Sequence, residues 1–174
     1  FQLAYLDDLR KIPDELFTLD KIQVLELRFL PKLEEIPSAI AKLRNLEQLY
    51  VNGTAIITIP KEISDLPRLK VLNLSQNKIG KLPTEIGNCK SLEHLALFAN
   101  NLYVLPPEMA NLSKLKSLEV HDNKLSVLSK GVCKIKTLEW LDYSYNDLRT
   151  LPPDIKYLEN LKGLVISRNR IVYL

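Results

Sequence analysis

The sequence predicts an α/β solenoid, with a curved parallel sheet on its concave side and short helices or 3-10 turns on its convex side. One apolar pattern recurs every 23 residues through nearly all of the 174 residues. In each unit, leucines first alternate with other residues, as in a strand, and a proline then opens a segment of wider spacing. A unit this short cannot bury its apolar face alone, so successive units must stack. We therefore predict one domain over residues 1–174.

The unit boundaries follow from the spacing of the pattern. A partial unit covers residues 1–21, and further units begin at residues 22, 46, 69, 92, 115, 138 and 161, the last of them truncated. The unit that begins at 22 carries one extra residue before Leu33. Because a solenoid needs polar caps, we expect either flanking sequence or the pairing of an end with another copy.

The first part of each unit is predicted to be a strand. Its apolar residues occupy alternate positions, as Leu95 and Leu97 do, and this is the period of a strand. Strands at the same phase of successive units must lie parallel and in register. One set of side chains then faces the core, including the unusual Tyr143, while the residues between them face the concave surface.

An asparagine follows the strand in five units, and we interpret it as structural. A buried asparagine both donates and accepts hydrogen bonds, so it can satisfy backbone groups of the turn. Leu30 and Thr54 take this position in two earlier units, so we expect the N-terminal part to be less regular. The five residues are Asn77, Asn100, Asn123, Asn146 and Asn169.

The second part of each unit is predicted to return along the convex side as a short helix. Proline is suited to the first helical position, where its missing N–H has no partner to lose. Ser129 replaces this proline in one unit. Helical turns are bulkier than strands, so the stack should bend with the sheet on the concave side.

The two cysteines are predicted to be free thiols. By position in the unit, Cys89 faces inward and Cys133 lies on the outer side. They are almost two units apart, farther than a disulfide can reach.

Composition and motifs argue against several classes of function. The net charge is only +3 and the basic residues are scattered, so we expect no nucleic-acid partner. No apolar run is long enough to span a membrane, and the first residues do not resemble a signal peptide. Phosphate-binding glycine loops and HExxH motifs are absent from the sequence. We expect no enzymatic activity, no cofactor and no metal site.

The concave positions of the later units are the best candidates for binding, because the core does not dictate them. They include the only Trp and both His residues, and exposed aromatic residues beside charged groups are typical of a binding hot spot. Cross-strand packing that only stabilises the sheet is the alternative. The predicted patch consists of His94, Phe98, Glu119, His121, Trp140, Asp142 and Tyr145.

Two acidic residues of this patch fall on adjacent strands. Glu119 and Asp142 are predicted to face each other, and like charges in that arrangement repel. A basic group of a partner or a cation would relieve the repulsion, although solvation alone is an alternative.

The repeat resembles leucine-rich repeats over residues 22–174. Its LPxxIxxL ending, as in Leu82 to Cys89, is similar to the 23-residue class. That class occurs in cytoplasmic Ras-pathway scaffold proteins, in plant relatives, and in secreted or surface proteins of pathogenic spirochaetes. The resemblance implies a horseshoe-shaped protein-binding module without catalysis.

The leading functional hypothesis is a secreted or cell-surface bacterial protein. It would bind a host-cell receptor or adhesion protein through its concave face, without inserting into a membrane. The alternative is a cytoplasmic scaffold, or the sensing domain of a larger signalling protein. We expect a monomer, with a dimer formed through the repeat ends as the open alternative.

Overall fold

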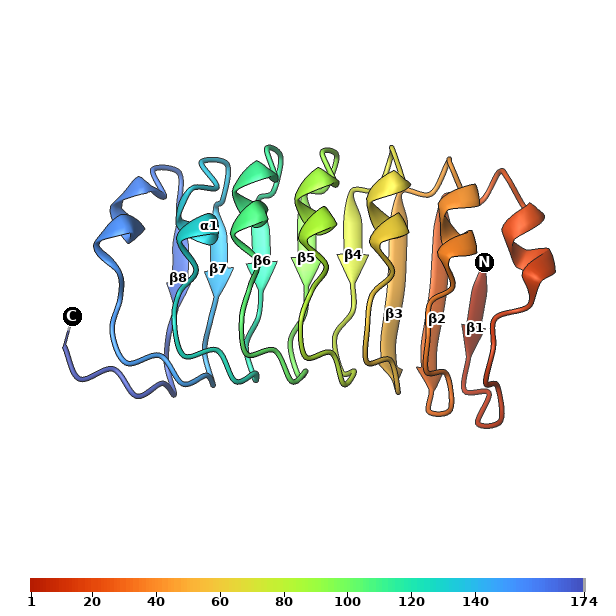
Figure 1. The fold of residues 1–174 in the computed structure, drawn as a ribbon, viewed down its shortest axis with the longest axis horizontal. Helices are drawn as coiled ribbons and strands as arrows, with labels where there is room; N and C mark the ends of the chain where they lie inside the picture. The colour runs from red at the N-terminus through yellow and green to blue at the C-terminus, as the bar shows by residue number, and fades with distance from the viewer. Residues whose placement is uncertain (174) are drawn as a thin grey trace.

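The computed structural model describes residues 1–173, and over this range eight parallel strands form one sheet in chain order (Figure 1). The predicted α/β solenoid is confirmed. Leu174, the last residue of the predicted domain, lies outside the described residues. The strands are β1 (Gln2–Ala4), β2 (Val24–Leu30), β3 (Gln48–Thr54), β4 (Val71–Asn73), β5 (His94–Ala96), β6 (Ser117–Glu119), β7 (Trp140–Asp142) and β8 (Gly163–Val165).

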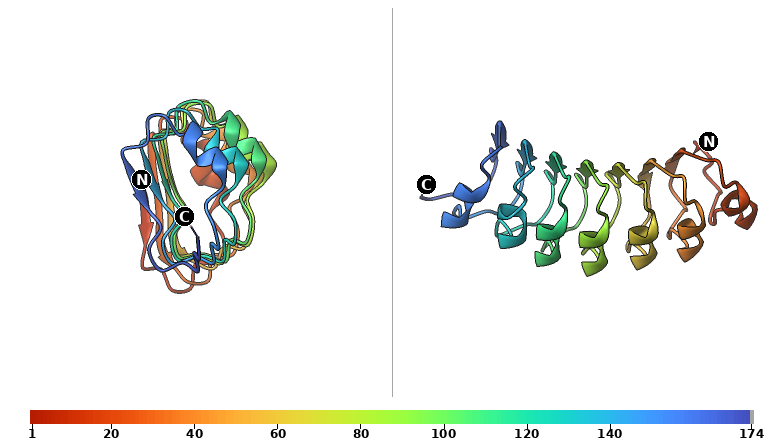
Figure 2. Two further views of the ribbon diagram at one scale, coloured as in Figure 1. Left: turned by 90° about the vertical axis from the view of Figure 1, so that its left-hand side faces the viewer. Right: turned by 90° about the horizontal axis from the view of Figure 1, so that it is seen from above.

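The stack of units is curved. Seen from above, the strands lie on the inner side of an arc and the helical turns on the outer side (Figure 2). The concave surface is therefore formed by the sheet, as the sequence predicts.

The register of the sheet follows the repeat. Ser117 of β6 pairs with Trp140 of β7, and Glu119 pairs with Asp142. Between them, Leu118 and Leu141 point into the core and are fully buried. The same alternation holds along the sheet, so one continuous apolar core runs through the stack and the intervening side chains face outward.

Most convex segments are 3-10 helices, and the proline that precedes them is not at the predicted position. The proline that follows the leucine is the residue before the first helical one, with an extended backbone, as Pro83 is. Its carbonyl oxygen accepts the first turn's hydrogen bond, from Ile86 N–H in this unit. The helices are η1 (Asp14–Thr18), η2 (Ser38–Lys42), η3 (Lys61–Asp65), η4 (Thr84–Asn88), η5 (Pro107–Asn111) and η6 (Pro153–Tyr157). In η5 and η6 a second proline, Pro107 or Pro153, takes the first helical position.

The unit that lacks the proline forms an α-helix instead, α1 (Lys130–Cys133). The Ser129 hydroxyl caps it by accepting a hydrogen bond of 3.2 Å from Gly131 N–H. The Ser129 carbonyl accepts from Cys133 N–H, which closes an α-type rather than a 3-10 turn.

The five predicted asparagines form a buried or half-buried ladder, which we call the asparagine ladder. Asn100 is representative: its amide N–H donates to Leu74 O at 2.9 Å and Leu97 O at 3.0 Å. Its side-chain oxygen accepts from Ile79 N–H at 3.0 Å. Each side chain thus bridges its own unit and the preceding one, as the structural interpretation predicts.

The N-terminal part of the sheet departs from the later units, as expected, but it does so by forming longer strands. β2 and β3 are the longest described strands, with seven residues each, and Leu30 pairs with Thr54 across them. Leu30 replaces the asparagine by packing into the core, where it is fully buried. Strand pairing therefore continues through the position that the asparagine ladder occupies in the later units.

A second series of equivalent residues has a left-handed backbone. It lies directly before the asparagine position, and its only glycine is Gly53, with φ of 68°. The others carry side chains, which is unusual because this region is strained for L-residues. They are Tyr5, Phe29, Gln76, Ala99, Asp122, Tyr145 and Arg168.

Two glycines set the spacing of the convex turns on both sides of η5. A Cβ atom at Gly87 would lie 2.3 Å from Glu108 O, and one at Gly131 would lie 2.4 Å from Pro107 O. The backbones of η4, η5 and α1 therefore approach one another more closely than any side chain would allow.

Both cysteines are free and buried, which corrects the prediction for Cys133. That residue is on the convex side, but α1 packs against the neighbouring turns and covers it completely. Burial raises the pKa of Cys89 to about 12 and that of Cys133 to about 11. Neither thiol is therefore suited to act as a nucleophile near neutral pH.

Candidate functional site

The seven residues of the predicted patch lie on or directly after β5, β6 and β7, on the concave side. Trp140 is 44% exposed and Tyr145 is 57% exposed. His94 is also exposed, and the other four residues are half-buried. The patch is thus accessible, although its members do not all touch one another.

Phe98 and His121 form the aromatic centre of the patch. Their rings are stacked, with centroids 4.5 Å apart and planes inclined by only 7°. They come from equivalent positions of neighbouring units, so the repeat itself brings them together. Such a cross-strand pair stabilises the sheet and also offers a flat surface to a partner.

The Asp142 carboxylate is held by groups of this chain. One oxygen accepts hydrogen bonds from Ser144 N–H at 2.9 Å and from the Ser144 hydroxyl at 2.6 Å. The other oxygen lies 3.4 Å from His121 Nδ1. The predicted repulsion with Glu119 is therefore reduced on the Asp142 side without an external cation.

Trp140 turns away from the stacked pair. A Cβ atom on Gly163 would lie 2.1 Å from Cε3 of the indole, so the ring covers this glycine on β8. Gly163 thus provides the space for the ring, which the sequence pattern alone did not reveal. Trp140 consequently extends the patch toward the C-terminal end of the sheet.

A shallow hollow of about 160 Å³ lies beside the patch, over β4, β5 and β6. We call it the concave hollow. His94 and Glu119 contribute to its wall, and the small side chains of Ala96 and Ser117 leave it open. Its remaining lining residues are Val71, Leu72, Asn73 and Leu95.

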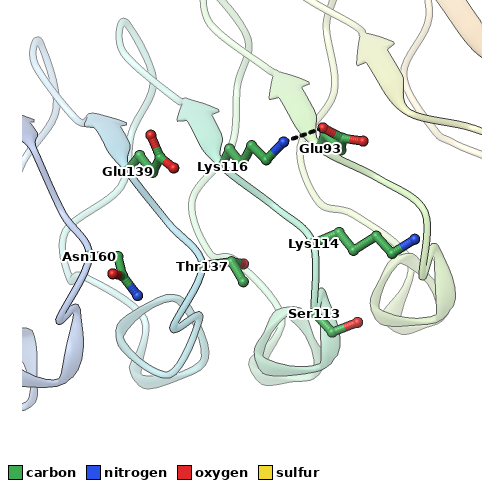
Figure 3. Close-up of a pocket in the computed structure, with 7 residues that line it drawn as sticks. All are labelled: Glu93, Ser113, Lys114, Lys116, Thr137, Glu139 and Asn160. Atoms are coloured by element: carbon green, nitrogen blue, oxygen red, sulfur yellow. Dashed lines mark hydrogen bonds and ion pairs between the residues drawn. The ribbon is translucent and has the colours of Figure 1, made fainter.

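A second hollow, of about 380 Å³, lies along the edge where the convex turns lead into the strands (Figure 3). Three of its charged groups are paired: Lys116 Nζ lies 2.6 Å from Glu93 Oε2, and Glu139 pairs with Lys162. The hydrogen bond from Lys116 lowers the pKa of Glu93. Sequence reasoning missed this series of pairs, although its signal is visible as Glu and Lys spaced 23 residues apart.

Within residues 1–173, no group of three or more His, Cys, Asp or Glu residues is arranged to hold a metal ion. Over the same range, no helix is both long enough and apolar enough to cross a membrane.

Comparison with known proteins identifies the family. The leucine rich repeat family matches residues 58–102, 90–148 and 113–171, which together span more than half of the chain. The chain belongs to the leucine-rich repeat family, and it is a protein-interaction domain of that family.

Two bacterial structures resemble this one along nearly its whole length. A leucine-rich repeat protein of Leptospira interrogans is 30% identical, with a TM-score of 0.72, and the match covers 95% of this chain and 48% of that one. An internalin of Listeria monocytogenes has a TM-score of 0.84 at 24% identity, over 95% of this chain and 46% of that one. At that identity the internalin shows the fold alone.

A curated relative matches over a shorter stretch. The volume-regulated anion channel subunit LRRC8B of Homo sapiens is 35% identical over 74 residues, which are 42% of this chain and 9% of that protein. The chain thus spans less than a tenth of this relative and about half of the two bacterial proteins.

Proposed function

We propose that the concave face binds a protein ligand through the patch around Phe98, His121, Trp140 and Tyr145. The observation that carries the proposal is that two large aromatic side chains, Trp140 and Tyr145, are exposed on the concave face. Large aromatic side chains contribute most of the binding energy in many interfaces, and a rigid sheet holds them in place at little entropic cost.

The proposed setting is the surface or the surroundings of a bacterium, where the ligand is a receptor or adhesion protein of a host cell. The similarity to the Leptospira protein over 95% of this chain supports a bacterial origin. The fold shared with an internalin is compatible with this setting. We propose that the domain is non-enzymatic, because both thiols are buried and, within residues 1–173, neither histidine forms a hydrogen bond with a serine hydroxyl, although Ser117 lies on the strand beside His94.

The test is capture of ligands by the immobilised protein from solubilised host-cell membranes and, in parallel, from bacterial lysate. The proposal expects a host-membrane protein that Trp140→Ala fails to retain. A matched pair controls for the loss of an aromatic ring: Tyr145 and Tyr103 are exposed by 57% and 56%, but only Tyr145 lies at the concave patch. Tyr145→Ala should reduce capture and Tyr103→Ala should not. Equal capture by all variants would refute the patch.

The second candidate is a scaffold or sensing domain inside a larger signalling protein. It is favoured by the channel subunit, in which the aligned repeats make up only 9% of the length. The same capture experiment separates the candidates. If the ligand comes from the bacterial lysate rather than from host-cell membranes, and Trp140→Ala fails to retain it, the second candidate is supported and the first is rejected.

A further inference from the structure

We propose that the concave hollow is a subsite for a Lys or Arg side chain of the protein ligand, with Glu119 as the acceptor of its cationic head group. The inference rests on the proposed protein-binding role of the concave face, and it adds the chemistry of one anchoring contact.

Glu119 differs from Glu26 and Asp142, the other acidic side chains on the strands of the concave surface, in lacking a partner, and it differs from Asp122 of the following turn in being half-buried rather than exposed. Glu26 pairs with Arg28 at 3.1 Å, and Asp142 accepts hydrogen bonds from Ser144 and lies 3.4 Å from His121 Nδ1. Over residues 1–173, the Glu119 carboxylate forms neither an ion pair nor a side-chain hydrogen bond, although the residue is half-buried. The carboxylate of this half-buried residue is therefore free to accept a charge-assisted hydrogen bond from a ligand.

The charge of the surroundings favours a cation. Lys and Arg make up 24 of the 174 residues, yet none occupies an outward-facing position of the described strands β3 to β8. The lysines at the strand starts are already engaged, Lys70 with Glu47 and Lys116 with Glu93. A chain of net positive charge thus presents a concave surface on which Glu119 and Asp142 are the charged groups of β5 to β7.

The shape of the hollow suits a long amphipathic side chain. Ala96 and Ser117 stand beside Glu119 and leave space where larger residues would fill the surface. The aliphatic stem of Lys or Arg can lie along Val71 and Ala96 while its head group reaches the carboxylate. Arginine has the advantage of a planar fork that matches a carboxylate.

The experiment is an NMR titration of the whole chain with N-acetyl-arginine methylamide, and with the citrulline analogue as a neutral probe of nearly the same shape. We expect weak, saturable shifts at Ala96, Ser117 and Glu119. The citrulline probe should bind about tenfold more weakly, because it lacks the charge that strengthens a hydrogen bond to a carboxylate. Equal binding of both probes, or no saturable shift at these residues, would overturn the proposal.

Two variants and a matched control locate the contact. Glu119→Gln should weaken binding of the arginine probe about tenfold, because the charge assistance is lost. Glu139→Gln changes the net charge equally, but Glu139 lies on the edge and pairs with Lys162, so it should have no effect. Ala96→Leu fills the hollow without changing charge and should also abolish binding. If Glu139→Gln acts as strongly as Glu119→Gln, the attraction is only a long-range one and the subsite is rejected.

Failure of the subsite and failure of the proposed function give different results. If Trp140→Ala abolishes ligand capture while Glu119→Gln changes neither capture nor probe binding, the concave face binds protein but the subsite is wrong. If the arginine probe binds as expected while capture does not depend on Trp140 or Tyr145, the subsite stands and the aromatic contact is rejected.

Discussion

The last residues of β2 and β3 and the turns after β4 to β8 place different side chains at the equivalent position of the unit. In the first region, Leu30 packs into the core and the strands continue through the position by pairing Leu30 with Thr54. In the second region, the strands are shorter and the asparagine ladder binds the carbonyl groups of two successive units. At this position the backbone groups of neighbouring units are paired either by continued strand pairing or by the amide of an asparagine.

Thr54 joins the two regions. Its hydroxyl accepts a hydrogen bond from Ile56 N–H at 3.4 Å and donates to the side-chain oxygen of Asn77. In the units that follow, an asparagine oxygen accepts directly from the equivalent backbone N–H, as Asn100 does from Ile79. The Thr54 hydroxyl therefore stands between a backbone N–H and an asparagine oxygen that bond directly in the later units.

The largest effect on stability is expected when asparagine replaces Leu30. Leu30→Asn should lower the free energy of unfolding by about 4 kcal/mol, because a fully buried side chain is lost and an amide is buried among paired strands. Urea unfolding followed by circular dichroism measures the change, with Leu30→Met as a control of similar volume. A variant as stable as the parent chain would show that the two routes are interchangeable.

The next effect comes from removing one member of the asparagine ladder. Asn100→Ala should lower the free energy of unfolding by about 3 kcal/mol, since buried donors and acceptors of two units lose their partner. Asn101→Ala is the matched control, because Asn101 is the adjacent asparagine and is exposed. Similar unfolding midpoints for the two variants would contradict a structural role.

A smaller effect on stability is expected at Thr54, where the two regions meet. Thr54→Val keeps the shape of the side chain but removes the hydroxyl, and it should cost about 1–2 kcal/mol because Ile56 N–H and Asn77 lose a partner. Thr54→Ser retains the hydroxyl and should cost less than Thr54→Val. The reverse order, again in urea unfolding, would place the stabilisation in packing rather than in the hydrogen bonds of the hydroxyl.

The smallest effect concerns the left-handed residue before the asparagine. Ala99 has φ of 53°, so Ala99→Gly should raise the free energy of unfolding by about 0.5 kcal/mol through relief of strain. Ala96 lies within β5, where the same change should lower stability because glycine loses more entropy. A loss of stability in both variants would mean that the strain at Ala99 is negligible.

The sequence was sufficient for the fold and for the positions of the candidate residues. A strict 23-residue period leaves one possible register, so the pairing of Ser117 with Trp140 could be predicted without coordinates. The same reasoning placed Tyr143 in the core, where it is fully buried.

Contacts between side chains could not be predicted in this way. The period states which residues are neighbours, but not that Trp140 leans over Gly163 or that Ser144 binds Asp142, because these depend on side-chain conformation. The burial of Cys133 was missed for a related reason: it depends on how closely the convex turns pack, and no single unit contains that information.

The glycines on the convex side have a consequence for the opposite surface. Gly87 and Gly131 let the turns flanking η5 come close together, and a methyl group at either position would wedge them apart. Since the strands on the inner side remain tied by hydrogen bonds, widening the outer side alone would tighten the arc over β5 to β7. Two buried glycines on the convex side thus control the curvature of the concave surface on which a ligand would bind.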